Sequence, residues 1–468
     1  MLGESGNNRL VFPYNPALKG VNMKNSKWLS GVGLSLAAAL TLSACAGADD
    51  SGGGGATTGG GGGSSDQIVV TMVETLAFPE RTALMRGLLD KFEAENPDIK
   101  VDLISPPTEG ADDTILQLLQ SGSGADIVEV RDTTIRPWSQ NGWLADLNVL
   151  LADWDGWDNF TGAALADANQ TGDGAFMMPY GGYGISVFYR EDMLRDAGFD
   201  APPATWEEML EMAQAIHNPA EGRLGYALRG GLNGFTNVIL ALEAFNAPYL
   251  DTQNTFLQKD GQSTLFTAPY AKEALEVYFQ LAEVSGADAI NWGYPEMVEA
   301  FTNGSTAFLL QDPEVIRYVG ESEFVPQDEW NTAPMLLGPD GKTMRFLGNA
   351  GWGVVAQSAN PEAAARVVAF LGERDQAIAF AEGNSLVPPV TGADASPFYQ
   401  QKPWQSYQTM NADADTWIVG RQPRTVDFWA EWREKADQEQ QEVILGQRTI
   451  ESMLESWDAF WLEKLGIG

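Results

Sequence analysis

The chain contains one cysteine and one histidine, which limits the chemistry that its side chains can perform. The cysteine is Cys45 and the histidine is His217. No disulfide can form within the chain, no cluster of Cys and His can hold a metal, and catalysis assisted by histidine would have to use His217. His217 ends the helical pattern that runs from Trp206 to Ile216, a position typical of a surface histidine at a helix C-terminus. We therefore expect no catalysis that depends on histidine or cysteine, no metal and no cofactor.

Carboxylates are the most abundant reactive groups in the chain. It has 64 acidic and 28 basic residues, and its formal net charge at pH 7 is −36. Two carboxylates that flank a glycosidic bond can hydrolyse it, but no motif in the sequence selects such a pair. Nucleic acids and anionic membrane surfaces repel a polyanionic chain, so we expect neither as a partner. The same acidity is common in well-solvated secreted proteins.

Length and element order predict a two-part α/β fold. At 468 residues the chain exceeds what one hydrophobic core usually serves. Strands and helices alternate in its first third, which predicts a parallel sheet with right-handed crossovers. The predicted strands are Ile68 to Val73, Val101 to Ile104 and Asp126 to Val130, and the predicted helices are Pro79 to Glu95 and Thr114 to Gln120.

Polar side chains follow the predicted strands where each strand ends. Glu74 and Thr75 follow the first strand, Asp132 follows the third, and Asp312 follows a buried strand over Thr306 to Leu310. Ligands of α/β proteins bind beyond the carboxyl ends of parallel strands, so these side chains are candidate ligand contacts. For each one taken alone, an ordinary loop residue is an equally good interpretation.

The stretch from Phe176 to Gly198 is predicted to join the two halves of the chain. Tyr180 to Gly184 is rich in glycine and is predicted as a turn that lets a ligand approach Tyr180 and Tyr183. Ile185 to Tyr189 is predicted as a strand covered on both faces, followed by a short helix. A turn that faces a ligand and leads into a core strand is a plausible crossing between two lobes.

This stretch resembles the hinge segment of the family 1 extracellular solute-binding proteins of ABC importers, the group that includes maltose-binding protein. Other segments extend the resemblance to nearly all of the chain after Asp66. They are Pro202-Pro203-Ala204-Thr205-Trp206-Glu207, Asn360-Pro361-Glu362 and Leu386-Val387-Pro388-Pro389. Asp312-Pro313-Glu314 departs from the family's Gly-Pro-Trp, so one expected aromatic platform is missing.

The resemblance implies an α/β fold with two lobes, each a mostly parallel sheet flanked by helices. Three crossings would join the lobes near Gly184, Gly348 and Pro388. Residues 67–184 and 349–388 would form the first lobe, and residues 185–348 and 389–468 the second.

The resemblance also implies a function. The protein would be a monomer that captures a carbohydrate between its lobes by hinge closure, without catalysis, and delivers it to the permease subunits of an ABC importer. A binder of another small solute, such as a peptide or a polyamine, remains open within the same fold. A secreted glycoside hydrolase is the alternative from another functional class.

The resemblance suggests individual ligand contacts as well. Asp132 aligns with a hydroxyl-binding aspartate, Tyr183 takes the place of a ligand-contacting glutamate, and Phe235 falls near a stacking tyrosine. Trp429 and Arg433 share one helix face where the family has a sugar-contacting tryptophan and arginine, although a buried tryptophan beside a solvated arginine is equally plausible. The complete predicted set is Glu74, Thr75, Asp132, Tyr180, Tyr183, Phe235, Asp312, Trp352, Trp429 and Arg433.

The N-terminal region has the pattern of an export signal. In residues 23–44, two lysines precede the apolar run Leu29 to Leu42 and small residues come directly before Cys45. Leu42-Ser43-Ala44-Cys45 resembles a bacterial lipobox, in which the cysteine is acylated and becomes the mature N-terminus. We interpret residues 1–22 as an upstream extension before a start at Met23. Residues 45–66, rich in Gly and Ser, would tether the folded part to the extracytoplasmic face of the cell membrane, with a reach of about 25 Å.

Acylation of Cys45 is directly testable. Mass spectrometry of protein extracted from membranes is expected to show loss of the residues through Ala44 and the added mass of acyl chains on Cys45. A Cys45→Ser variant is expected to leave the membrane fraction, because a tether without its lipid has no membrane affinity. An exported protein with an unmodified Cys45 would contradict the interpretation.

Overall fold

The computed structural model describes residues 67–75, 79–106, 111–122 and 124–467. The predicted export signal, Cys45 and the tether lie outside the described residues. Within the described ranges, no helix is long and apolar enough to cross a bilayer.

The first sheet is built on the predicted parallel strands. Its strand order is β12-β11-β3-β1-β2, and β4 pairs with β11 beside this path. β1 pairs in parallel with β2 and β3, which confirms the predicted parallel arrangement at the start of the chain. The strands are β1 (Ile68–Val73), β2 (Ile99–Ile104), β3 (Ile127–Arg131), β4 (Met178–Gly184), β11 (Thr343–Val354) and β12 (Trp417–Gly420).

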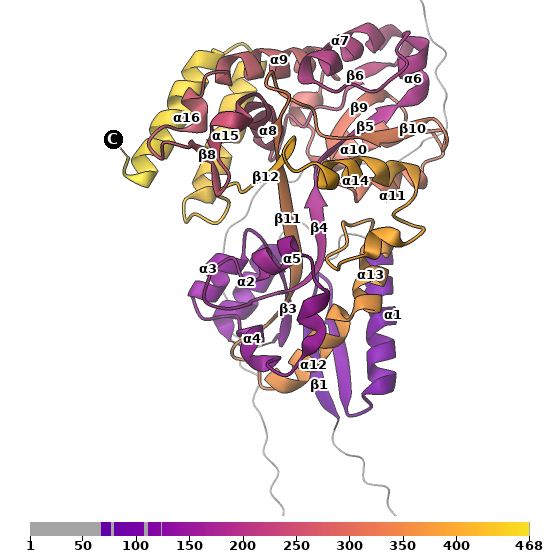
Figure 1. Cartoon of the computed structure of the whole chain (residues 1–468), viewed down its shortest axis with the longest axis vertical. Helices are drawn as coiled ribbons and strands as arrows, with labels where there is room; N and C mark the ends of the chain where they lie inside the picture. Colours follow the sequence, from indigo (N-terminus) through magenta and orange to yellow (C-terminus); the bar gives the residue numbers. More distant parts are fainter. Residues whose placement is uncertain (1–66, 76–78, 107–110, 123, 468) are drawn as a thin grey trace, which may run out of the picture. The chain divides into compact units, whose positions relative to one another are not determined.

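Helices from two separate stretches of the chain, residues 79–168 and 361–383, cover this sheet (Figure 1). Leu88, Leu89 and Phe92 form the buried stripe of α1, and Phe92 meets the ring of Phe370 on α12 at 5.5 Å. The helices that pack in this part are α1 (Pro79–Glu95), α2 (Ala111–Ser121), α3 (Ile135–Gln140), α4 (Leu147–Leu150), α5 (Gly162–Ala168), α12 (Pro361–Gly372) and α13 (Arg374–Gly383).

The predicted turn at Tyr180 to Gly184 is wrong, because these residues form the second half of strand β4. β4 pairs antiparallel with β11 over its length. Gly351 serves this close pairing, because a Cβ atom there would overlap the carbonyl oxygen of Met178 on β4. A Cβ atom on Gly181 would lie 2.8 Å from Leu386 in the segment after α13, so this glycine lets that segment approach β4.

The second sheet departs from the expectation of a mostly parallel arrangement. Its order is β10-β5-β9-β6, and only β6 and β9 are parallel. β5 enters from the first sheet, because Ile185 alone separates it from β4, and Ser186 at its start pairs with Gln311 at the end of β9. β5 therefore runs against β9, and the sheet is mixed. The strands are β5 (Ser186–Arg190), β6 (Leu224–Tyr226), β9 (Thr306–Gln311) and β10 (Trp330–Ala333).

Helices around the second sheet enclose a core rich in tryptophan. Trp432, Trp457 and Trp461 are fully buried, and the rings of Phe256 and Trp461 meet at 4.8 Å. The helices are α6 (Glu191–Asp196), α7 (Trp206–Ile216), α8 (Phe235–Asn246), α9 (Ala271–Glu283), α10 (Tyr294–Thr302), α11 (Val315–Gly320), α14 (Gln405–Ala412), α15 (Trp429–Ile444) and α16 (Ile450–Leu465). A hairpin of β7 (Leu250–Asp251) and β8 (Asn254–Gln258) packs beside them.

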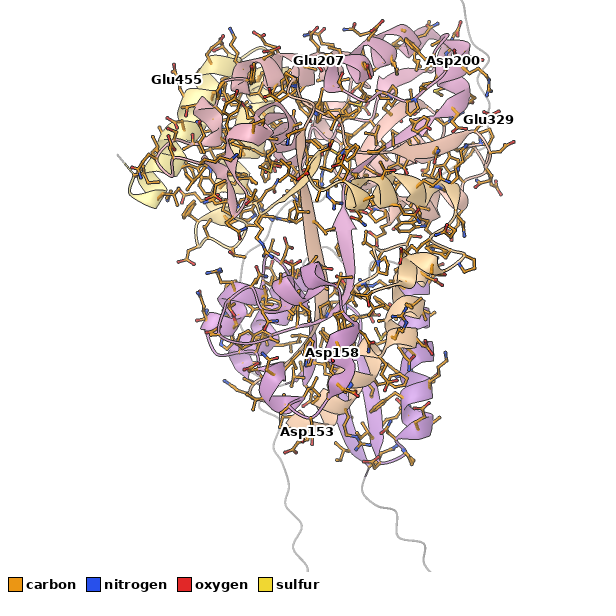
Figure 2. The ribbon with its side chains drawn as sticks, viewed as in Figure 1. Asp153, Asp158, Asp200, Glu207, Glu329 and Glu455 are labelled. Carbon is orange, nitrogen blue, oxygen red and sulfur yellow. The ribbon has the colours of Figure 1, made fainter. Side chains whose placement is uncertain are left out.

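Much of the acidic charge lies on the surface. Asp153, Asp200, Glu207 and Glu455 are exposed and, in Figure 2, project outward from four different elements or loops. Such carboxylates keep their hydration, so they add charge and solubility without a burial cost.

The close pairing of β4 and β11 gives a stability test. Gly351→Ala is expected to lower the free energy of unfolding by about 1–3 kcal/mol, because the added methyl group forces the two strands apart. Gly87→Ala is the matched control. Gly87 is exposed in the middle of α1 and its Cβ position is open, so alanine there is expected to raise stability by about 0.5–1 kcal/mol. Urea denaturation measures both, and equal effects would contradict the argument.

Candidate functional site

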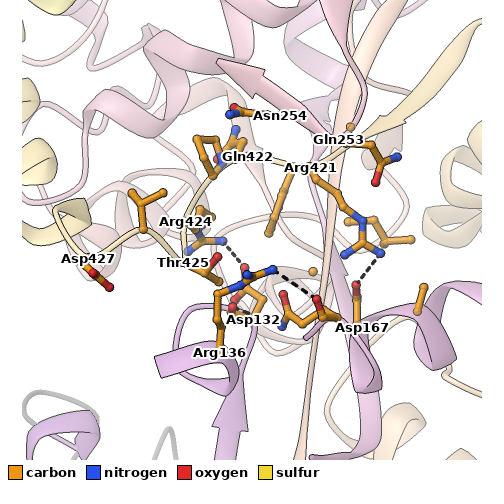
Figure 3. A pocket seen from close by; sticks show the side chains of 18 of the residues that line it. Asp132, Arg136, Asp167, Gln253, Asn254, Arg421, Gln422, Arg424, Thr425 and Asp427 are labelled. Carbon is orange, nitrogen blue, oxygen red and sulfur yellow. Dashed lines mark hydrogen bonds and ion pairs between the residues drawn. The ribbon is translucent and has the colours of Figure 1, made fainter. Parts of the chain in front are cut away.

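A cavity of ≈ 940 Å³ lies on one face of the β4–β11 ladder. One wall carries Asp132, Arg136 and Asp167, which follow β3 or belong to α3 and α5. The opposite wall is the loop of residues 420–428 between β12 and α15, which contributes Arg421 and Arg424 (Figure 3). Two segments far apart in the sequence therefore enclose one space.

Two ion pairs connect the walls. Arg424 Nη1 lies 3.0 Å from Asp132 Oδ2, and Arg421 Nη2 lies 3.2 Å from Asp167 Oδ1 (Figure 3). Asp167 Oδ2 also accepts a hydrogen bond of 2.6 Å from Asn349 Nδ2. Burial raises the pKa of Asp167, although the hydrogen bond from Asn349 and the charge of Arg421 oppose this shift. Both pairs are partly exposed, so solvent screens them and a ligand can compete for the same groups.

A second polar cluster adjoins the cavity and is centred on Glu129. This buried carboxylate accepts hydrogen bonds of 2.7 Å from the backbone N–H of Thr75 and from Tyr180 Oη. Its oxygens lie 3.3 Å from Arg81 Nη2 and 3.7 Å from Arg131 Nε. Burial by itself would raise the pKa of Glu129, but the two guanidinium groups and the hydrogen bonds outweigh it and lower that pKa to about 2. Glu129 is therefore a fixed anion.

The cluster and the cavity share a face of the ladder. Gly348 of β11 lies opposite Tyr183 of β4, and opposed residues of an antiparallel pair project to the same side. A Cβ atom on Gly348 would lie 3.4 Å from Asp132 Oδ2 in the cavity, while Tyr183 Oη lies 3.1 Å from Tyr180 Oη in the cluster. The adjacent residues Arg131 and Asp132 connect the two groups along the chain.

Four predicted site residues occur in or beside this cluster. The hydroxyl groups of Tyr180 and Tyr183 are hydrogen-bonded to each other at 3.1 Å. Thr75 Oγ1 accepts a hydrogen bond of 2.9 Å from Arg131 Nη2. Glu74 is fully buried and accepts a hydrogen bond of 3.0 Å from Ser105 Oγ. Burial raises the pKa of Glu74. The structure thus brings these residues together, and their contact with a ligand stays a prediction.

Asp312 lies at the end of β9, as predicted, with Glu314 beside it. Burial raises the pKa of both carboxyl groups, and the charge of Asp312 raises that of Glu314 further. Tyr294 Oη lies 3.4 Å from Glu314 Oε2. Arg317, on the helix that follows, reaches Glu80 of α1 at 3.6 Å, so this segment also approaches the elements around the first sheet.

The remaining predicted residues lie apart from the cavity. Phe235 is buried, and its ring lies 6.0 Å from those of Trp429 and Trp432. Trp352 is buried against the ring of Tyr180 at 4.8 Å, whereas Arg433 is exposed on α15. Among the ten predicted contacts, Asp132 lines the cavity. In the described part of the chain, no group of three or more His, Cys, Asp and Glu side chains is arranged to hold a metal.

Sequence reasoning missed most of the polar lining. Arg136, Asp167 and Arg424 have no pattern that separates them from surface residues, because each lies in a short helix or a loop. One signal was available. The loop Gly420 to Arg424 places two arginines directly before a tryptophan-rich helix, which is unusual in a chain with few basic residues.

Residues 78–378 match the model of the bacterial extracellular solute-binding protein family. The chain belongs to this family. YcjN of Escherichia coli K12, whose name describes an ABC transporter periplasmic-binding protein, is 24% identical over 242 residues. That match covers 51% of this chain and spans only about half of the relative, 54% of its length.

Solved structures of solute-binding proteins share the fold. An ABC substrate-binding protein from Listeria monocytogenes in complex with cycloalternan superposes with a TM-score of 0.72 at 18% identity, covering 86% of this chain and all of that one. Maltose-bound MalE3 of T. maritima gives 0.72 at 22% identity, covering 85% of this chain and 100% of that one. The predicted two-lobed α/β fold of this solute-binding protein is thereby confirmed.

Glu243 of α8 lies behind the wall of the cavity that carries Gln422. It is 1% exposed, and it accepts hydrogen bonds from Thr255 Oγ1 at 2.5 Å and from Gln422 Nε2 at 3.1 Å. Burial raises the pKa of Glu243 to about 7, and the two hydrogen bonds oppose the shift only in part. The carboxyl group is thus more easily protonated in the folded protein than in the unfolded chain.

This shift predicts a pH dependence of stability. The pKa of Glu243 is higher in the folded protein than in the unfolded chain, so this group stabilises the folded state fully below about pH 4.5. That stabilisation is lost as the pH rises through about 7. Glu243→Gln removes the ionisation. From about pH 5 to pH 8, the free energy of unfolding of the variant is therefore expected to rise relative to that of the wild type by up to about 3 kcal/mol. Urea denaturation at both pH values measures this gain. A variant that gains nothing on the wild type between these two pH values would contradict the prediction.

Proposed function

We propose that this protein captures a carbohydrate in the cavity between Asp132 and Arg424 and delivers it to an ABC importer. The observation that carries the proposal is the lining of the cavity. Amide and guanidinium groups face it from two sides, and Phe346 and Phe428 add apolar rings. The relatives that share the fold are bound to cycloalternan and to maltose, which supports a sugar as the ligand class.

The lining suits the chemistry of a sugar. Each hydroxyl group both donates and accepts hydrogen bonds, and planar amides offer both functions at fixed geometry. Carboxylates accept from two hydroxyl groups at once, and the ring faces pack on the C–H surface of a sugar. The lining amides are Gln140, Gln170, Gln253, Asn254 and Gln422.

Closure around the ligand follows from the position of the ion pairs. Arg424–Asp132 and Arg421–Asp167 join the loop before α15 to the elements around the first sheet. A ligand that touches both walls adds contacts that exist only in the closed arrangement, so it shifts the population toward closure. We propose crossings near Gly184, Gly348 and Pro388, and lobes with the boundaries predicted from the sequence. No catalytic step is required.

The proposal includes the cellular setting. The protein acts as a monomer, held at the extracytoplasmic face of the membrane by lipid on Cys45, and it docks on permease subunits of the importer. Two other functions compete with this proposal: binding of a different small solute and hydrolysis of glycosides. Turnover of oligosaccharides by the purified protein would support hydrolysis, and preferential binding of peptides or polyamines would support another solute class.

Asp132→Asn tests the cavity as the binding site. A fluorimetric screen against a carbohydrate panel first finds sugars that raise the melting temperature, because such ligands bind the native state. Calorimetry with the best sugar is then expected to show a loss of about 1–3 kcal/mol in binding for Asp132→Asn, since the change breaks the Arg424 pair and removes a charged acceptor.

Asp153→Asn is the matched control, because Asp153 is exposed outside the cavity. It is expected to keep the affinity of the wild type. Unchanged affinity in Asp132→Asn would show that the ligand binds elsewhere, and a panel without any binder would contradict the proposed function.

A further inference from the structure

The charged lining of the cavity differs in sign from the rest of the protein. Acidic residues outnumber basic ones 64 to 28 in the whole chain. The cavity reverses this ratio, because four cationic side chains face it with three carboxylates. The cations are Arg136, Arg421, Arg424 and Lys464, and the carboxylates are Asp132, Asp167 and Asp427. Positive charge has thus been concentrated at one site of a polyanionic protein.

The carboxylates do not neutralise all of these cations. Asp132 is paired with Arg424, and Asp167 is shared between Arg421 and Asn349. Asp427 is exposed near the end of the loop that leads into α15. Lys464 has its own partner in Glu431, which does not line the cavity. The remaining cation is Arg136.

Arg136 lacks an anionic partner among the residues that the structure describes. Its Nη2 donates a hydrogen bond of 3.3 Å to the backbone oxygen of Gln170. Its Nε is buried and has no hydrogen-bond acceptor in the described part of the chain. No carboxylate of the described chain lies within ion-pair distance, although the partly buried guanidinium group is always charged. A partly desolvated charge without a counter-ion is costly, so an anion brought by a ligand would gain from its presence.

We propose that the cavity selects a carbohydrate that carries a carboxylate, such as a uronic acid residue, and that Arg136 is the partner of that carboxylate. This inference rests on the proposed function, whose sugar-binding amides line the same space. The planar guanidinium group matches a planar carboxylate better than a point charge does. A single unmatched cation balances one negative charge, which is what one uronic acid unit supplies.

The geometry also accounts for the other two arginines. Arg424 stacks over the ring of Phe346 at 4.8 Å and Arg421 is tied to Asp167, so both are held in place by neighbours. They raise the local positive potential, but each already has a carboxylate partner that a ligand would have to displace. Arg136 then sets the preference for the acid, and the amides hold the hydroxyl groups.

Matched pairs of sugars test the inference by calorimetry. The pairs are galacturonate with galactose, glucuronate with glucose, and α-1,4-digalacturonate with α-1,4-galactobiose. The acid of at least one pair is expected to bind about tenfold more tightly than its neutral partner, since a charge-assisted pair contributes about 1.5 kcal/mol or more. Its affinity is expected to fall as salt is added, while that of the neutral sugar stays constant.

Variants of Arg136 assign the preference. Arg136→Gln is expected to bring the two members of a pair to similar affinity, and Arg136→Lys is expected to keep part of the preference because it keeps the charge. Arg195→Gln is the control, because Arg195 is exposed and pairs with Glu329 away from the cavity. It is expected to behave as the wild type.

The outcomes separate this inference from the proposed function. Neutral sugars that bind as tightly as their acids would overturn the inference and leave the proposed function standing. A folded Arg136→Gln protein that keeps the preference would overturn the role of Arg136. If Arg136→Gln does not fold, acid binding to the wild type that is independent of salt would overturn the inference. No binding to any sugar of either kind would overturn both proposals.

Discussion

The close pairing of β4 and β11 is the constraint on which the rest of the structure depends. β4 continues through Ile185 into β5 of the second sheet, and β11 pairs with both β12 and β3. The two sheets therefore meet at this ladder. Gly351 permits the approach because a side chain at this position would collide with the backbone of Met178 on β4. The ladder fixes which residues share a face, and it thereby places Tyr183 on the same side as the space beside Gly348.

The charged side chains around the ladder form two different arrangements. Glu129, Arg81 and Arg131 form a network in which each buried charge has a partner, so the strand ends of the first sheet are held rigidly. The cavity next to it has partly exposed ion pairs and one arginine, Arg136, that has no anionic partner among the described residues. A rigid base beside a set of exchangeable contacts is a suitable arrangement for a protein that must bind and release a solute.

The relatives show how far fold and ligand preference can separate. The two solved structures superpose on this chain with TM-scores of 0.72, although their identities are 18% and 22%. At that distance the architecture is shared while the side chains of the cavity are not determined by it. The ligand class of this chain therefore has to be derived from its own lining, in which arginine is unusually frequent for a protein of net charge −36.

The sequence by itself determined the local elements and the family. Helix α1 and strand β1 have the bounds that periodicity predicts. It failed at β4, because a glycine-rich run is compatible with a turn or with a tightly paired strand, and only the partner strand decides between them. It also failed for the direction of the strands in the second sheet.

Only the tertiary structure decided the composition of the cavity. Asp132 and Arg424 form an ion pair across 292 residues of sequence, and Asn349 meets Asp167 across 182. No local pattern encodes such contacts, because they arise when two distant loops are brought to one face of the ladder. Only the assembled cavity decides whether a charged side chain has a partner. For Arg136, the lack of an anionic partner among the described residues can be seen in the tertiary structure but not in the sequence.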